Sequence, residues 1–151
     1  MKVNLLKKQV IMFIVMVIVG MLFNPMNMLA FKFEHLYIST TLFYGGLLMA
    51  SNMMWSHEIV HYLSMGHFNK KIFVLGLFLS CFCVFLLRQQ INVSPNQWLR
   101  RMIPHHSTAL TTTNKLIKNN KTQKDSKLFR LAKDIIDTQK REILFMKNML
   151  K

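Results

Sequence analysis

The sequence predicts an all-α membrane protein with three hydrophobic helices followed by an antiparallel pair of polar helices. Apolar residues make up 52% of the 151-residue chain, and they are concentrated in its first 87 positions. Several of these runs approach the ~20 residues needed to cross a bilayer. The rest of the chain is polar, basic and too short to bury a large core alone. We therefore divide the chain into a membrane region, residues 1–91, and a hairpin domain, residues 92–151.

Three transmembrane helices are expected, over about residues 10–31, 36–66 and 72–90. A basic head before the first apolar run resembles a signal peptide, but no small-residue cleavage site follows, so we expect a retained helix. The flanking charges weakly favour a cytoplasmic N-terminus, by five basic residues against four. This orientation predicts an integral protein of an inner or plasma membrane with the hairpin domain outside the cytoplasm.

The hairpin domain begins with a helix start signal. Ser94 can cap the helix, Pro95 suits the first helical position, and Gln97 completes a capping box. Asn119-Asn120 is expected to end this helix, and a second one to run from about Ser126 to Leu150. The predicted inner faces are Leu99, Met102, His106, Ala109, Thr113 and Leu116 on the first helix, and Leu128, Ala132, Ile135, Gln139, Glu142, Met146 and Met149 on the second. Two such helices are half of a four-helix bundle, which predicts a homodimer.

The charge of the chain indicates its surroundings. The net charge is +14, and positions 95–151 hold 13 Lys and Arg against four Asp and Glu. A basic segment beside a membrane typically contacts anionic head groups, so the lipid bilayer is the expected partner. No nucleic-acid-binding module is recognisable, and we expect no nucleic acid. Cys81 and Cys83 lie in one apolar run and are expected to be packing or lipid-facing thiols rather than a disulfide framework.

The hairpin carries a candidate metal site. Met102 and His106 are four residues apart and share a helix face, with His105 beside them. Pro104 is expected to kink this helix. On the second helix, the residues that face Met102 and His106 interrupt an otherwise apolar stripe; they are Gln139, Glu142 and Met146. Imidazole and thioether together favour copper, and thioether especially Cu(I). The alternative is that the histidines are solvated or bound to head groups and that Glu142 forms a surface ion pair.

The run from Met102 to Ala109, Met-Ile-Pro-His-His-Ser-Thr-Ala, resembles the signature of the domain of unknown function 305 family. The second helix is similar to the closing pattern of that family through Leu131-Ala132, Ile135-Ile136, Gln139, Glu142-Ile143, Met146 and Leu150. The resemblance covers about residues 97–150 and implies a ferritin-like helical bundle, with some members implicated in copper binding. It implies Met102, His105, His106 and Met146 as ligands, supported by Gln139 and Glu142. Thr111, Thr112 and Thr113 stand where many members have a methionine, which implies weaker Cu(I) binding.

A second set of donors recurs every four residues on the predicted second membrane helix and beyond it. The set is Met49, Met53, His57, His61 and Met65. Neighbours at this spacing stay in contact along a helix. Met53, His57, His61 and Met65 are therefore secondary metal candidates, with apolar packing as the alternative.

The segment His57-Glu58-Ile59-Val60-His61 also matches the zinc protease signature, with His67 where a third histidine would fall. Such an enzyme needs a substrate cleft around the motif, and no catalytic domain is recognisable here.

Taken together, these patterns predict a membrane-anchored metal-binding protein, not an enzyme, that acts in copper binding, delivery or tolerance. A protein that donates or accepts the metal is a further expected partner. Two alternatives remain open at this stage. One is a structural or lipid-contacting membrane module without metal, and the other is a membrane zinc metalloprotease that uses His57, Glu58 and His61.

Overall fold

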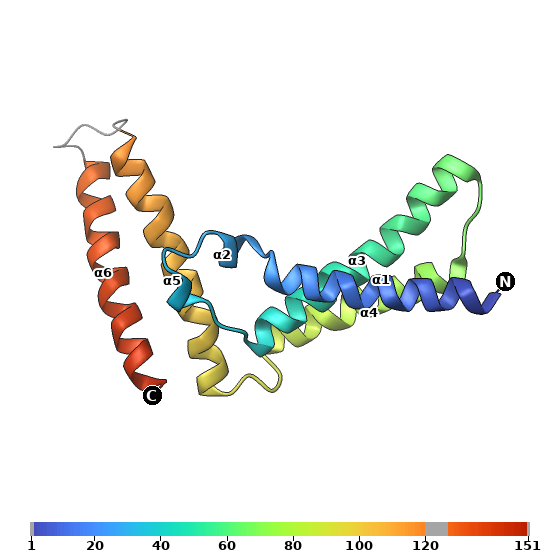
Figure 1. The fold of residues 1–151 in the computed structure, drawn as a ribbon, viewed down its shortest axis with the longest axis horizontal. Helices are drawn as coiled ribbons and strands as arrows, with labels where there is room; N and C mark the ends of the chain where they lie inside the picture. Colours follow the sequence, from blue (N-terminus) through green and yellow to red (C-terminus); the bar gives the residue numbers. More distant parts are fainter. Residues whose placement is uncertain (1, 120–126, 151) are drawn as a thin grey trace. The chain divides into compact units, whose positions relative to one another are not determined.

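The computed structural model describes residues 2–119 and 127–150, and within these ranges the chain forms helices and no β-strand. The elements are α1 (Lys2–Leu22), α2 (Pro25–Met28), the 3₁₀ turn η1 (Phe33–His35), α3 (Thr40–Met65), α4 (Lys70–Gln89), α5 (Pro95–Lys118) and α6 (Lys127–Met149) (Figure 1). The all-α prediction is confirmed. Asn120 and Ser126, where we expected a break and a helix start, lie outside the described residues.

The chain folds as two compact units. Unit 1 contains residues 1–23 and 40–93, and unit 2 contains residues 24–39 and 94–151. The predicted boundary near residue 92 therefore lies close to the third of three crossings between the units. Residues 24–39 belong with the hairpin, which the sequence does not indicate.

In unit 1, α3 packs against both α1 and α4. Glycines allow the close approach of these helices. A Cβ atom on Gly46 would lie 2.8 Å from the carbonyl oxygen of Val17 in α1, and one on Gly76 would lie 2.9 Å from the amide nitrogen of Trp55 in α3. Helices pack this closely where small residues line the contact.

Two stretches of the described chain are long and apolar enough to cross a membrane, Lys7–Met28 and Lys70–Gln89. The predicted third span over residues 36–66 is not among them. The α3 sequence contains Ser51, Asn52, Ser56, His57 and Glu58, which lower its hydropathy. Two of these polar side chains, Ser51 and Glu58, are buried, as expected for a helix with neighbours on two sides.

The predicted first helix, residues 10–31, is also corrected. Helix α1 ends at Leu22, and a separate short helix starts at Pro25. Asn24 is extended and its side-chain oxygen accepts a hydrogen bond from the amide of Met26 at 2.8 Å. An extended residue before proline followed by a capped turn is a helix start, and it separates α2 from α1.

In unit 2, α5 and α6 lie side by side and form the predicted hairpin (Figure 1). The start of α5 is as expected, because Ser94 Oγ accepts a hydrogen bond from the Gln97 amide at 3.4 Å and Pro95 opens the helix. The core consists of Leu99, Ile103, Leu110, Ile136, Ile143 and Met146. Both α2 and η1 pack on α5.

The predicted inner face was partly wrong. Helix α5 fully buries Leu99, Ile103, Pro104, Ser107 and Leu110, whereas His106 and Ala109 are only partly buried. Leu116, Leu128 and Met149, which we had placed inside, are exposed. The reason is that α5 is covered on two sides. Helix α6 packs on one side and residues 24–39 pack on another, so α5 buries side chains toward both.

Candidate functional site

The centre of the candidate site is an imidazole beside a carboxylate. Nδ1 of His106 in α5 lies 2.9 Å from Oε2 of Glu142 in α6. The His106 side chain is mostly buried and that of Glu142 is half-exposed. Nδ1 is itself buried, and its contact with the carboxylate lies outside hydrogen-bond geometry. Gln139 Nε2 donates to the same Oε2 atom at 3.4 Å, so Glu142 is held from both helices.

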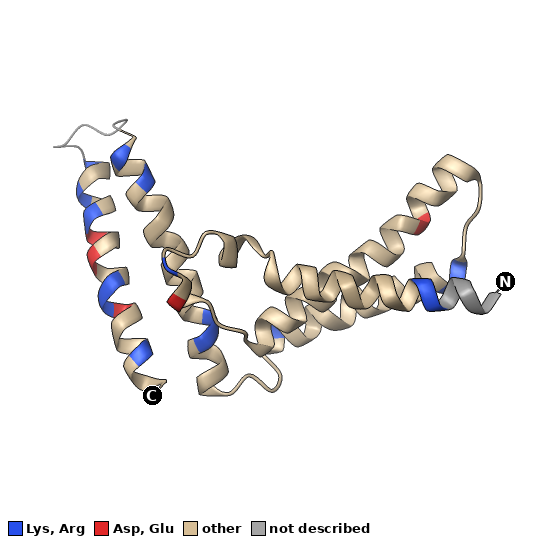
Figure 2. Cartoon of the chain, viewed as in Figure 1, with Lys and Arg blue, Asp and Glu red and all other residues tan. Residues whose placement is uncertain are grey.

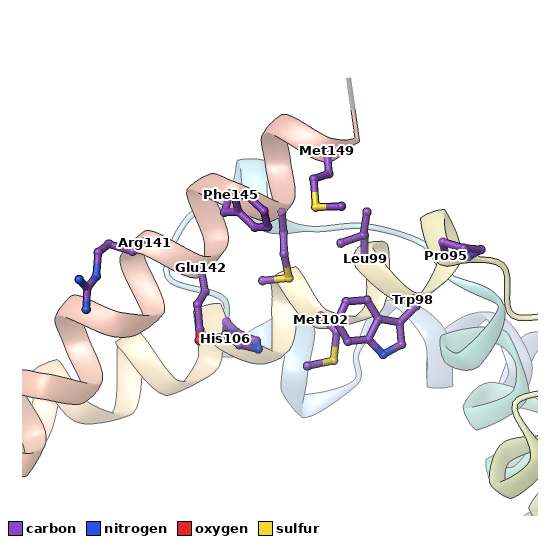
Figure 3. A pocket seen from close by; sticks show the side chains of 10 residues that line it. Pro95, Trp98, Leu99, Met102, His106, Arg141, Glu142, Phe145 and Met149 are labelled. Carbon is purple, nitrogen blue, oxygen red and sulfur yellow. Dashed lines mark ion pairs between the residues drawn. The ribbon is translucent and has the colours of Figure 1, made fainter.

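His106 and Glu142 line a cavity of about 680 Å³ between α5 and α6. Figure 3 shows Trp98, Met102 and His106 reaching it from α5, and Glu142, Phe145 and Met149 from α6. Met146, which is buried in the core, lines the cavity as well. One imidazole, one carboxylate, the guanidinium of Arg141 and three thioethers therefore line a mostly apolar hollow.

Helical spacing brings these side chains together. Met102 and His106 are one turn apart on α5, as are Glu142 and Met146 on α6, so that each pair points to the same side of its helix. Pro104 lies between the first pair and is buried within a helix that runs unbroken from Pro95 to Lys118. Because proline has no amide hydrogen, the carbonyl of Arg100 lacks its usual helical partner.

His105 does not share this cavity. It is exposed and lines a separate hollow together with residues of the 24–29 segment and with Thr108, Ala109 and Thr112. The rings of His105 and His106 are 5.7 Å apart and steeply inclined to each other. The structure thus brings Met102, His106, Gln139, Glu142 and Met146 together, and places His105 elsewhere.

Within the described residues, no group of three or more His, Cys, Asp and Glu side chains is arranged to hold a metal ion. The α5–α6 cavity supplies two side chains of these types. A metal ion in this cavity would therefore depend on thioether sulfur for its remaining protein ligands. Such a donor set fits a soft ion better than it fits a hard one.

The secondary candidates lie in unit 1 at the end of α3. The rings of His57 and His61 stack at 5.9 Å, and both line a cavity of about 610 Å³ with His67. Met53 and Met65 are exposed and do not line it. Nδ1 of His61 lies 3.1 Å from the carbonyl of His67, so this nitrogen is the donor of the ring.

Glu58, the central residue of the protease-like signature, has a local structural role. Its side chain is buried, and Oε2 accepts a hydrogen bond from the amide of Asn69 at 2.9 Å. Asn69 is the residue that caps α4. The carboxylate thereby fixes the turn between α3 and α4.

A buried polar junction near the cavity was not predicted. Ser107 is fully buried; its Oγ accepts a hydrogen bond from the amide of Phe31 at 2.7 Å and lies 2.8 Å from Nδ1 of His35. Burial lowers the pKa of His35, and the charge of Lys147 lowers it further. A neutral His35 can accept a hydrogen bond from the hydroxyl of Ser107. This junction ties residues 24–39 to α5.

The only sequence signal for this junction was the position of Ser107 directly after the His-His pair. A serine in a helix usually bonds to its own backbone or to water. Its partners here are 72 and 76 positions away in the sequence, so local spacing carries no information about them.

The fold and the cavity define a class of protein: a helical hairpin with an imidazole–carboxylate pair and thioethers at one level, preceded by apolar helices. The model of the domain of unknown function 305 (DUF305) family matches residues 87–150. An uncharacterized protein of Acanthamoeba polyphaga mimivirus is 32% identical over 127 residues, which is 84% of this chain and 81% of that protein. The chain belongs to the DUF305 family. No solved structure matches it.

Proposed function

We propose that the protein binds a soft metal ion, with copper as Cu(I) the favoured species, in the cavity between α5 and α6. The single observation that carries this proposal is the position of His106. Its buried Nδ1 faces Glu142, while the cavity around it is lined by Met102, Met146 and Met149.

The chemistry of the donors supports a division of roles. Histidines that bind metals usually present one ring nitrogen to the metal and the other to a carboxylate, which sets the tautomer. A proton on Nδ1, directed toward Glu142, would leave the lone pair of His106 on Nε2. The ligands in this proposal are His106, Met102 and Met146, and Gln139 and Glu142 orient the imidazole.

The soft character of the set favours Cu(I) over zinc or a hard cation. Thioether sulfur selects Cu(I), whereas carboxylate, carbonyl and water suit magnesium, calcium and manganese. When bound, copper would be held in a largely apolar pocket. We propose no reaction. These donors are consistent with copper binding, copper delivery or copper tolerance, including exchange of the ion with a second protein.

The proposal also includes a membrane anchor. Lys7–Met28 and Lys70–Gln89 are apolar over the length of a span, and only 11% and 17% of them are buried inside the molecule. Surfaces of this size that remain uncovered and apolar are suited to lipid.

The test is a Cu(I) titration of the full chain in detergent, in competition with a chromophoric chelator. Cys81 and Cys83 are replaced by serine throughout, so that thiols do not bind the ion. We expect His106→Ala and Met102→Leu/Met146→Leu to abolish competition, since leucine keeps the volume of methionine and removes its sulfur. Glu142→Gln should weaken binding roughly ten- to a hundredfold.

Two matched variants serve as controls. His105→Ala removes the other histidine of the pair, and Met28→Leu removes an exposed thioether of unit 2 outside the cavity. Both should bind Cu(I) as the parent does. The proposal fails if the parent protein does not compete for Cu(I), or if His105→Ala loses the ion while His106→Ala retains it.

A further inference from the structure

Helix α6 has an exposed apolar seam in addition to its buried one. The buried side consists of Ala132, Ile136, Ile143 and Met146. Next to it, a second series recurs at alternating steps of three and four residues: Leu128, Leu131, Ile135, Thr138, Glu142, Phe145 and Met149. We call this series the outer seam. Its spacing is that of a coiled-coil interface maintained over three heptads.

The outer seam is open to solvent. Leu131 is 55% exposed, Phe145 67% and Met149 57%. Trp98 of α5, 49% exposed, lies on the same side of the hairpin, because it lines the α5–α6 cavity together with Phe145 and Met149. Aromatic and aliphatic side chains gathered in this way on one face mark a docking surface.

We propose that the outer seam binds the outer seam of a second copy of this chain, with the two α6 helices antiparallel. A two-fold interface places residue i of one copy against residue j of the other and j against i. The charges beside the seam satisfy this rule. Asp134 and Arg141 both precede a seam residue by one position and flank the seam on the same side, before Ile135 and Glu142.

Antiparallel pairing puts Asp134 of each copy beside Arg141 of the other, which gives two ion pairs by symmetry. Parallel pairing would instead place Asp134 beside Gln139 of the other copy and Arg141 beside Met146, so that neither ion pair could form. Neither residue forms an ion pair within the described part of the chain, so both are available. Figure 2 shows basic residues toward both ends of α6 and acidic and basic residues side by side in its middle.

An anionic membrane surface is the competing occupant of an amphipathic basic helix. The acidic residue beside the seam disfavours it, because Asp134 would face anionic head groups. Thr138 and Glu142 in the middle of the seam are also typical of a protein interface, where polar residues within an apolar seam set register. The inference goes beyond the proposed metal binding and does not depend on it.

The experiment is mass determination by light scattering of the full chain in detergent, over a range of protein concentrations. We expect a dimer. Asp134→Arg and Arg141→Asp should each weaken dimerisation at least roughly tenfold, and the double variant Asp134→Arg/Arg141→Asp should restore it. Lys140→Asp makes the same charge change as Arg141→Asp, but Lys140 lines the opposite hollow near η1 and should have no effect.

A second pair of variants tests the apolar contact. Leu131→Ser lies in the seam and should dissociate the dimer, whereas Leu144→Ser changes an equally exposed leucine outside it. A monomeric parent protein, or a double charge reversal that does not restore the dimer, overturns the proposal. It is also overturned if Leu131→Ser leaves the mass unchanged and instead abolishes binding to phosphatidylserine vesicles. Because mass is measured without copper, failure here is distinguishable from failure of metal binding.

Discussion

Replacing Ser107 by alanine should weaken the docking of residues 24–39 on α5. Its hydroxyl is fully buried, accepts the amide hydrogen of Phe31 and contacts Nδ1 of His35. Alanine fits the same space and leaves both partners without a hydrogen bond. Leaving one buried polar group unsatisfied costs about 1–3 kcal/mol. Two such groups would together cost about 2–6 kcal/mol. Phe31 is partly exposed, so its amide can bond to water instead, and we expect a total loss of docking free energy of ~2 kcal/mol.

A loss of ~2 kcal/mol corresponds to a roughly thirtyfold increase in the undocked population. Hydrogen exchange of the peptides that span residues 24–39, followed by mass spectrometry, measures this population directly. We expect the amide of Phe31 to exchange roughly thirtyfold faster in Ser107→Ala.

Thr112→Ala is the matched control for this change. The hydroxyl of Thr112 is exposed and donates to the carbonyl of Thr108 in its own helix at 3.1 Å. Its loss should leave exchange of residues 24–39 unchanged. If Ser107→Ala also exchanges at the parent rate, the buried junction does not hold this segment and our account of why α5 buries Ile103 and Ser107 is wrong.

Three further outcomes are expected. Burial lowers the pKa of His35 below its ordinary value of 6.5, so the undocked segment takes up a proton at a higher pH than the docked segment does. Docking of residues 24–39 should therefore weaken as pH falls below about 6.5, and His35→Gln should remove this dependence of exchange on pH. Gly46→Ala, whose Cβ would lie 2.8 Å from the carbonyl of Val17, should lower the thermal stability of unit 1 by about 1–3 kcal/mol, whereas Gly45→Ala, which has open space, should not. Glu58→Gln keeps an acceptor for the amide of Asn69 and should leave thermal stability unchanged while Glu58→Ala lowers it; proteolytic activity that Glu58→Gln abolishes would instead support the zinc-protease alternative.

The parts of the fold that local sequence encodes were predicted well. Ser94 and Pro95 mark the start of α5 through hydrogen-bond and backbone preferences of single residues. Met102 and His106 are four residues apart on α5, as are Glu142 and Met146 on α6. This spacing predicts that the four side chains lie at one level of the hairpin, and they line one cavity. These features depend on neighbours within one helical turn or on pairing of adjacent helices.

The parts that depend on distant contacts were not predictable in this way. The apolar run through Asn24-Pro25 was read as one helix, although residues 24–39 pack with the hairpin through Ser107. That contact also decides which side of α5 is buried, and it places His105 in a different hollow from His106. The apolar first half of α3 predicts a membrane span, but its second half is polar, and apart from the buried Ser51 and Glu58 it is largely exposed.

The central claim is that His106, Met102 and Met146 bind copper in the cavity between α5 and α6. The most direct measurement is X-ray absorption at the copper edge of the Cu(I)-loaded full chain, with Cys81 and Cys83 replaced by serine. The account predicts sulfur and nitrogen ligands together, with the sulfur contribution lost in Met102→Leu/Met146→Leu and retained in Met28→Leu. A copper environment of nitrogen and oxygen alone, unchanged by removal of the two cavity methionines, would contradict it.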